Sequence, residues 1–186
     1  MPTPPRAAPD DTCGLVQAAQ GGDRTAFAQL YTAFARVVHG LALASCGSRE
    51  AEDVTQEVFV KAFAQLGTLR DPAAFPAWLG TLARSTAIDR QRQRQRQRTT
   101  PLAEEPLGRE PRPDTNLEQR DASAAALACI RRLPDTYRDT LLLRLVEGLS
   151  GPEIAARTGM THGSVRVNLT RGMALLRPLL AQEGLP

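Results

Sequence analysis

Residues 149–171 are LSGPEIAARTGMTHGSVRVNLTR, a stretch with the pattern of a helix, a tight turn and a second helix. Ser150 is predicted to cap the first helix, because Glu153 follows three residues later to complete a capping box and Pro152 lies in the first turn. Gly159 stands where a helix end most often needs a left-handed backbone. Thr161 can cap the second helix, whose apolar residues recur at helical spacing as Val165, Leu169, Met173 and Leu176. The stretch therefore predicts a helix-turn-helix.

The second helix of this motif carries a polar, basic face. This pattern leaves four side chains exposed, namely Ser164, Arg166, Asn168 and Arg171. Arginine and asparagine side chains match the edges of guanine and adenine in a major groove. An ordinary αα-hairpin with a solvated face is the alternative, but the coincidence of cap, glycine turn and basic helix favours DNA binding.

Composition places the chain among soluble proteins without a cofactor. The 186 residues carry a net charge of +3, and Lys61 is the only lysine, so nearly all basic groups are arginines suited to planar contacts with phosphate and guanine. The cysteines (Cys13, Cys46 and Cys129) and histidines (His39 and His162) show no paired spacing. We expect no disulfide framework and no metal site. Without an apolar signal core or a long apolar stretch, a cytoplasmic location is expected.

The N-terminal half has helical periodicity throughout. After a Pro-rich start that we expect to be disordered (1–12), an apolar stripe runs through Phe27, Leu30, Tyr31, Phe34, Val37, Val38 and Leu41. Further helices are predicted over 50–66 and over about 73–90, and no segment alternates with period two. We therefore predict an all-α fold of two small helical domains, over 13–95 and 122–182. The second contains the helix-turn-helix.

A change in amino-acid composition marks the boundary between the two domains. Residues 90–98 alternate Arg and Gln without an apolar stripe, and 84–98 carry six arginines against one acid. Residues 99–121 are Pro-rich with three arginines and six acids, so we predict a flexible linker over 96–121. The basic run is either a phosphate contact or a solvated tail.

Two blocks of sequence resemble a known family. DVTQEVFVKAF (53–63), followed by FPAWL (75–79) and ARSTAID (83–89), resembles the second conserved region of bacterial sigma factors. LPDTYR (133–138), EGLS (147–150) and THGSVR (161–166) resemble their fourth region. Both blocks occur in order with only a linker between them, as in the extracytoplasmic-function (ECF) group of the sigma-70 family. The resemblance covers about residues 14–95 and 120–180.

The resemblance implies a surface for RNA polymerase and another for the start-site-proximal (−10) promoter element. The helix with the D-x-x-Q-E-x-F block would dock on the coiled coil of the large catalytic subunit through Asp53, Gln56, Glu57, Phe59 and Lys61. Melted DNA near the start site would be contacted by Arg70, Arg84, Ser85, Asp89, Arg90 and Arg92. Ser85 stands where the family usually has Asn, and a hydroxyl makes fewer bonds than an amide. The spacing of Trp78 with Phe75 and Leu82 favours core packing over stacking on DNA.

The second helix of the motif would contact the upstream (−35) element. By resemblance, the residues are Ser164, Arg166, Val167, Asn168, Thr170 and Arg171. Asn168 stands where the family often has Arg. Because Asn prefers adenine, we expect an altered upstream motif there.

The resemblance implies a promoter-specificity subunit that is not an enzyme, with core RNA polymerase (coiled coil and flap) and promoter DNA as partners and an anti-sigma factor as inhibitor. Promoter elements two helical turns apart are separated by roughly 70 Å, while a tether of about 30 residues has a preferred span near 30 Å. We therefore expect polymerase to hold the domains apart and the free chain to bind promoters poorly.

Two other functions stay open at this point. A free-standing helix-turn-helix regulator would use the N-terminal domain to dimerise and would bind a palindromic site. A metal-dependent nucleic-acid-processing enzyme would need an acidic cluster, for which Glu50, Glu52, Asp53 and Glu57 on one helix are the candidates.

Overall fold

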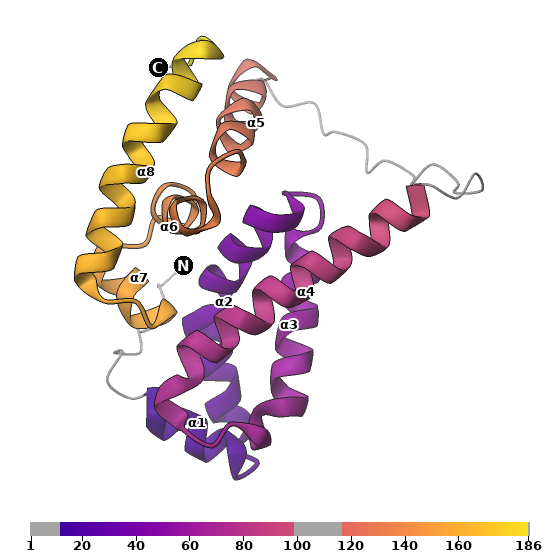
Figure 1. Ribbon diagram of the computed structural model, residues 1–186. Coiled ribbons are helices and arrows are strands. Elements are labelled where there is room, and N and C mark those ends of the chain that lie inside the picture. The colour runs from indigo at the N-terminus through magenta and orange to yellow at the C-terminus, as the bar shows by residue number, and fades with distance from the viewer. Residues whose placement is uncertain (1–11, 99–116, 186) are drawn as a thin grey trace.

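The computed structural model describes residues 12–98 and 117–185, and every regular element within them is helical, as predicted. The N-terminal domain comprises α1 (Thr12–Gln20), α2 (Arg24–Cys46), α3 (Ala51–Gln65), the 3₁₀ turns η2 (Leu66–Thr68) and η3 (Pro72–Ala74), and α4 (Phe75–Arg98) (Figure 1). The C-terminal domain comprises α5 (Leu117–Arg131), α6 (Asp135–Leu145), α7 (Gly151–Thr158) and α8 (His162–Gln182). The predicted disordered N-terminus and most of the predicted linker lie outside the described residues.

Helix α2 is the central element of the N-terminal domain, and α1, α3 and α4 all pack against it. Its N-cap residue is Asp23, whose Oδ1 accepts hydrogen bonds from the backbone N–H groups of Thr25 (2.7 Å) and Ala26 (3.2 Å). Its buried residues include most of the predicted apolar stripe, namely Leu30, Phe34, Val37, Val38 and Leu41. Burying such a stripe supplies the main stabilisation of an amphipathic helix in a small domain.

Helix α4 continues through the basic run to Arg98, beyond the predicted end near residue 90. Its first half is anchored by residues buried at every fourth position, Phe75, Leu79, Ala83 and Ala87. Further along, the guanidinium groups of Arg90 and Arg94 lie 3.0 and 2.9 Å from the carboxylates of Glu57 and Glu50. Ion pairs with α3 therefore replace apolar contacts along the second half of α4.

The helix-turn-helix has the capping groups predicted for it. The backbone N–H of Ser150 donates to Glu153 Oε2 (2.9 Å), and the N–H of Glu153 donates to Ser150 Oγ (3.4 Å), which completes the capping box. Gly159 ends α7 with φ of +75°, a conformation that disfavours any side chain. Thr161 caps α8 by accepting from the N–H of Ser164 (3.1 Å).

Gly172 lies where α8 crosses α6, and this explains a glycine in the middle of a helix. A Cβ atom at this position would stand 3.0 Å from Leu141 Cδ1 and 3.2 Å from Tyr137 Cβ. Such distances are tighter than ordinary van der Waals contact, so any side chain would push the two helices apart.

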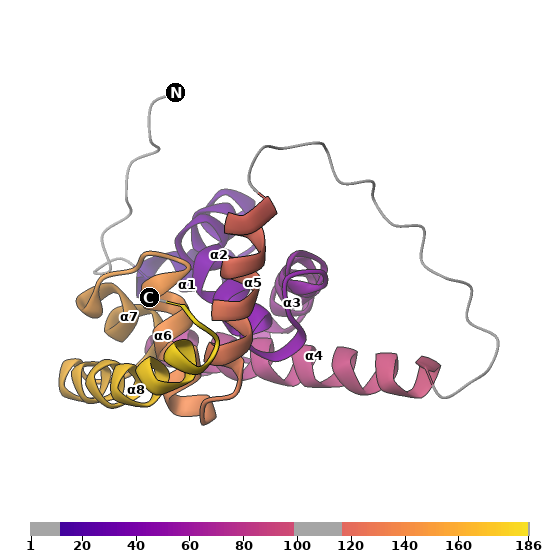
Figure 2. The ribbon, with the colours of Figure 1, turned by 90° about the horizontal axis from the view of Figure 1, so that it is seen from above.

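The two domains pack directly against each other, and their buried side chains form one continuous hydrophobic core. Helix α6 lies against α2, and α7 lies against α2 and α4 (Figure 2). At one close approach, a Cβ atom on Gly40 of α2 would stand 2.8 Å from Leu143 Cδ2 of α6. A second close approach brings Gly159 against Ala77 at the start of α4, with 3.3 Å between the two Cβ positions. The two domains were predicted from the sequence, but the contact between them was not.

Three further features concern cofactors and membranes. Cys13 is exposed, Cys46 and Cys129 are buried, and all three are free thiols. In the described ranges, no three His, Cys, Asp or Glu side chains are grouped so that they could hold a metal ion. No helix in the described part of the chain has both the length and the apolar character that crossing a bilayer requires.

Candidate nucleic-acid interface

Helix α8 presents most of the residues predicted to contact the upstream element. Arg166, Val167, Thr170 and Arg171 are exposed, and the Thr170 hydroxyl donates to the backbone carbonyl of Arg166 (3.0 Å). Ser164 is also exposed, with its Oγ 2.8 Å from Thr161 Oγ1 at the N-cap. The two arginines and the small side chains between them could approach a major groove without rearrangement of the helix.

Asn168 corrects the predicted set. Its side chain is only 7% exposed, and its Nδ2 lies 3.4 Å from Thr140 Oγ1 on α6. It stands three residues after the buried Val165 and four before the buried Gly172, so it belongs to the packed face of α8. In this arrangement the amide cannot reach a base edge. The structure therefore contradicts the predicted adenine contact through Asn168.

The predicted polymerase-binding residues divide between the surface and the interior of α3. Asp53 and Gln56 are exposed, whereas Phe59 is 4% exposed and packs its ring against Tyr31, with centroids 4.5 Å apart. Phe59 is therefore a core residue that supports the helix from inside. The prediction that Phe59 lies on the docking surface is therefore wrong.

Glu57 is at the centre of a charge network between α3 and α4. Its carboxylate lies 2.8 Å from Lys61 Nζ and 3.0 Å from Arg90 Nη2. The hydrogen bond from Lys61 lowers the pKa of Glu57, and the Arg90 guanidinium acts in the same direction. Four acids were considered as metal ligands of an enzyme. Two of them, Glu57 and Glu50, form ion pairs with arginines of α4.

The residues predicted for the start-site-proximal element line the exposed side of α4 and the loop before it. Arg70, Ser85, Asp89 and Arg92 are exposed, and Ser85 donates its hydroxyl proton to the Leu82 carbonyl (3.0 Å). Arg92 lies 4.0 Å from Asp89, an exposed pair that contributes little to stability. Trp78 is partly buried against the core with its ring centroid 5.8 Å from that of Phe75. This confirms the core interpretation of Trp78.

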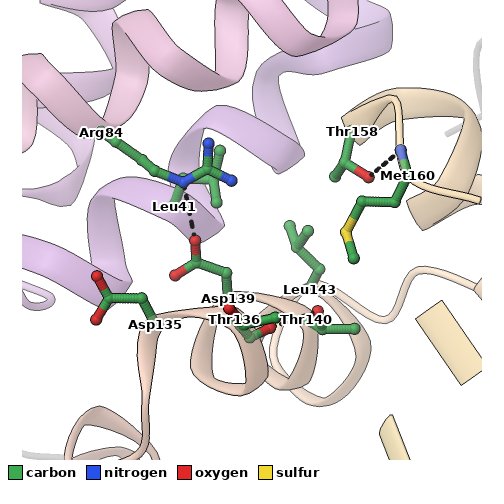
Figure 3. A pocket seen from close by; sticks show the side chains of 9 residues that line it. All are labelled: Leu41, Arg84, Asp135, Thr136, Asp139, Thr140, Leu143, Thr158 and Met160. Atoms are coloured by element: carbon green, nitrogen blue, oxygen red, sulfur yellow. Dashed lines mark hydrogen bonds and ion pairs between the residues drawn. The ribbon is translucent and has the colours of Figure 1, made fainter. Parts of the chain in front are cut away.

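Arg84 differs from these residues because it points at the other domain. Its Nε donates to Asp139 Oδ2 of α6 at 3.0 Å (Figure 3). The pair lines a cavity of about 280 Å³ between the domains. The other lining residues are Leu41, Asp135, Thr136, Thr140, Leu143, Thr158 and Met160. Burial raises the pKa of Asp139, although the hydrogen bond from Arg84 opposes that effect.

A second polar contact between the domains centres on Glu147, in the turn after α6. Its Oε1 lies 2.6 Å from His39 Nδ1, and its Oε2 lies 3.8 Å from Arg36 Nε, both on α2. The hydrogen bond to Glu147 raises the pKa of His39, more than burial lowers it. His39, Asp139 and Glu147 were not among the predicted site residues. His39 and Glu147 lie 108 residues apart in the chain, and Asp139 lies 55 residues from Arg84. Partners so far apart leave no spacing signal in a sequence.

Comparisons with known proteins agree with the two-region pattern. The family model for sigma-70 region 2 matches residues 30–97, and the model for sigma-70 region 4 matches residues 123–176. The ECF RNA polymerase sigma factor SigM of Mycobacterium tuberculosis is 31% identical over 167 residues, which cover 89% of this chain and 83% of SigM. The chain belongs to the sigma-70 family of sigma factors, in the ECF group.

A second relative shows the range of lengths in this sigma factor family. The probable RNA polymerase sigma factor RfaY of Xanthomonas campestris is 32% identical over 174 residues, which cover 89% of this sigma factor and 43% of RfaY. The chain spans between about two fifths and two thirds of the length of the first curated relatives it matches.

The fold also has a counterpart among solved structures. The structure of CnrH in complex with the cytosolic domain of CnrY matches with a TM-score of 0.60 at 24% identity, over 93% of this chain and 99% of that chain. In this sigma factor, the region 2 match begins inside α2, at residue 30, and covers α3 and nearly all of α4. The region 4 match begins inside α5 and ends at Leu176 of α8.

Proposed function

We propose that this sigma factor binds core RNA polymerase and directs transcription initiation at promoters by contacting an upstream and a start-site-proximal element. The observation that carries the proposal is the presence of regions 2 and 4 in one chain, with exposed arginines on a fully capped helix-turn-helix. A free-standing regulator would need only the second of these features. As a member of a family of specificity subunits, it is assigned no catalytic residues.

The polymerase-binding surface in this proposal is the polar side of α3. Asp53 and Gln56 are exposed there, and Glu57 and Lys61 are half-buried beside them. Carboxylate and amide groups on one helix face suit basic and amide groups on a partner helix. By family resemblance, the partner is the coiled coil of the large catalytic subunit, and the flap is the second contact.

The DNA-binding surfaces in this proposal are the exposed side of α4 and the exposed side of α8. Arg70, Ser85, Asp89, Arg90 and Arg92 would contact the start-site-proximal element, together with Arg84 once Asp139 releases it. Ser164, Arg166, Val167, Thr170 and Arg171 would contact the upstream element. An anti-sigma factor that covers the polymerase-binding surface would be the inhibitor, and the site of action would be the cytoplasm, where RNA polymerase works.

Run-off transcription with purified core polymerase tests the proposal. Candidate promoters come from sequencing transcripts after overexpression and aligning the DNA upstream of their starts. The full chain should support specific transcripts, and Arg171→Ala should reduce them by roughly 10- to 100-fold, the value of one good base contact. Arg177→Ala is the matched control, because Arg177 is exposed further along the same helix and outside the predicted contact set.

Two outcomes would contradict the proposal. Failure to co-purify with core polymerase, together with a stable dimer on a palindromic site, would support a free-standing regulator. Metal-dependent cleavage of DNA by the purified chain would support a nucleic-acid-processing enzyme.

A further inference from the structure

A side-chain amide joins the end of α1 to the loop that carries Arg70. Gln20, the last residue of α1, donates from its amide nitrogen to two backbone carbonyls, Leu66 O at 2.9 Å and Leu69 O at 2.7 Å. Because both partners are acceptors, the amide nitrogen with its two N–H groups is the end of the side chain that can serve them. The bonds connect segments 46 and 49 residues apart, and α1 also lies against η2 and η3 on either side of the loop.

The next turn of the chain offers no donor for the Leu69 carbonyl. Leu69 is extended, with φ of −74° and ψ of 108°. A tight turn would bond its carbonyl to the N–H three residues later, but that residue is Pro72, which has no N–H. The following N–H, of Ala73, donates to Asp71 Oδ1 at 3.0 Å. The Gln20 amide therefore satisfies a carbonyl that the local backbone leaves without a partner.

Arg70 is thereby held between two fixed neighbours. On one side, the Leu69 side chain packs against the core while its carbonyl is bonded to Gln20. On the other side, Asp71 caps η3. Arg70 itself is exposed and belongs to the set proposed for the start-site-proximal element. A side chain discriminates between bases only where its backbone is held in place, so the anchoring of this loop matters for selection.

The packing of α1 does not depend on the Gln20 amide. Val16 is fully buried in the core, and the Asp23 cap fixes the start of α2 just after α1. Helix α1 also lies outside the match to the region 2 family model, which begins at residue 30. Loss of the amide should therefore release the loop and leave the N-terminal domain folded.

We infer that Gln20 is a positioning residue for base selection at the start-site-proximal element: its amide fixes the backbone before Arg70, so that Arg70 meets a base of the melted DNA in one orientation. The inference rests on the proposed function. Gln20 acts through the loop and does not itself contact DNA. Each neutral hydrogen bond is worth roughly 5-fold in the equilibrium between the held and the released loop, and the two together are worth roughly 30-fold.

Transcription by the full chain bound to core polymerase tests the inference. The templates carry each of the four bases in turn at each position of the start-site-proximal element. Gln20→Glu keeps the shape of the side chain but replaces the two donors by an acceptor, and Gln20→Met removes them without adding charge. Both variants should lower the preference for the favoured base at one position by roughly 5- to 30-fold. Base preferences at the upstream element should stay unchanged.

Gln17→Glu is the matched control, because Gln17 is exposed on the same helix and undergoes the same change of charge. Hydrogen exchange on the free chain supplies a second measurement that needs neither polymerase nor DNA. Backbone amides over 67–71 should exchange roughly 5- to 30-fold faster in Gln20→Glu and in Gln20→Met, while amides of α1 keep their protection. The exchange rates in Gln17→Glu should match those of the wild type.

Two results would overturn the inference. One is a uniform loss of transcription with unchanged base preferences, which would give Gln20 a role in the fold alone. The other is unchanged hydrogen exchange over 67–71 in both Gln20 variants. A wild-type chain that makes no specific transcript with core polymerase would instead contradict the proposed function, and base selection by this loop with it. Hydrogen exchange would still report whether Gln20 holds the loop.

Discussion

The amide of Asn168 points into the C-terminal domain, where Nδ2 lies 3.4 Å from Thr140 Oγ1. The Thr140 hydroxyl itself donates to the Thr136 carbonyl at 2.9 Å, so it remains bonded without the amide. Loss of one neutral hydrogen bond of this kind is worth about 1 kcal/mol. Asn168 is thus a packing residue on the same helix that exposes Arg166 and Arg171.

Replacing Asn168 by Ala should lower the free energy of unfolding by about 1 kcal/mol and leave the base preference at the upstream element unchanged. Arg171→Ala should have the opposite effects. Because the Arg171 side chain is exposed, its loss should leave the free energy of unfolding nearly normal and relax the base preference at one base pair. Thermal unfolding and selection from a randomised upstream element measure the two effects. A shift of base preference in Asn168→Ala at normal stability would contradict the buried placement.

Gly172 offers a test of the α6–α8 crossing. Alanine would gain up to about 1 kcal/mol of helix propensity, but overpacking costs about 1–3 kcal/mol. The added Cβ meets Leu141 at 3.0 Å and the backbone-proximal Cβ of Tyr137 at 3.2 Å, which cannot easily move. We expect Gly172→Ala to destabilise the chain by about 1 kcal/mol. Gly163→Ala on the same helix is the control and should be neutral or stabilising, since its nearest neighbour would be 3.9 Å away.

At the scale of elements, the second half of α4 is stabilised by carboxylates at the right spacing, one on α3 and one on its N-cap residue. Arg90 and Arg94 fall four residues apart and meet Glu57 and Glu50. Partly exposed pairs of this kind contribute about 0.2–1 kcal/mol each. The basic run is therefore a marginally stable extension, and two acids contribute to its order.

Removing one of these acids should fray the end of α4. In Glu50→Ala we expect backbone amides over 93–98 to exchange hydrogen about two to five times faster, while amides in the first half of α4 keep their protection. Glu52→Ala, an exposed residue on the same helix α3, is the control. Equal exchange rates at 93–98 in Glu50→Ala and wild type would show that the ion pairs do not hold the extension.

Local signals in the sequence predicted most elements, and long-range contacts explain the misses. The capping box of Ser150 and Glu153 and the turn at Gly159 involve neighbours within a few residues, so their chemistry is visible in the sequence. Asn168 was misplaced because it lies at the edge of the apolar stripe, where only the position of α6 decides which face is covered. The pairing of Arg84 with Asp139 spans 55 residues and depends on how two domains meet, which no periodicity encodes.

At the scale of the whole molecule, the contact between the domains should respond to pH through His39. The charged groups that act on its ring are Glu147 from the C-terminal domain and, at longer range, Glu52 on α3. Arg36, on the same helix as His39, pairs with Glu147. While the two domains are packed together, the hydrogen bond to Glu147 raises the pKa of His39 above its ordinary value of 6.5. The chain with its domains packed therefore binds this proton more tightly than a chain with its domains apart, in which the ring would be solvated.

The contact between the domains should accordingly be strongest below pH 6.5 and weaken as pH rises through the raised pKa of His39. The raised pKa of Asp139 acts in the same direction but in a more acidic window, starting near its ordinary value of 3.8. Energy transfer between a dye on the exposed Cys13 of α1 and a dye on Ala128→Cys, an exposed position of α5, reports the distance between the two domains. It should decrease from pH 6 to pH 8, and the change should flatten in His39→Gln and in Glu147→Gln. A profile that keeps its full slope in His39→Gln would assign the pH response of the domain contact to another group.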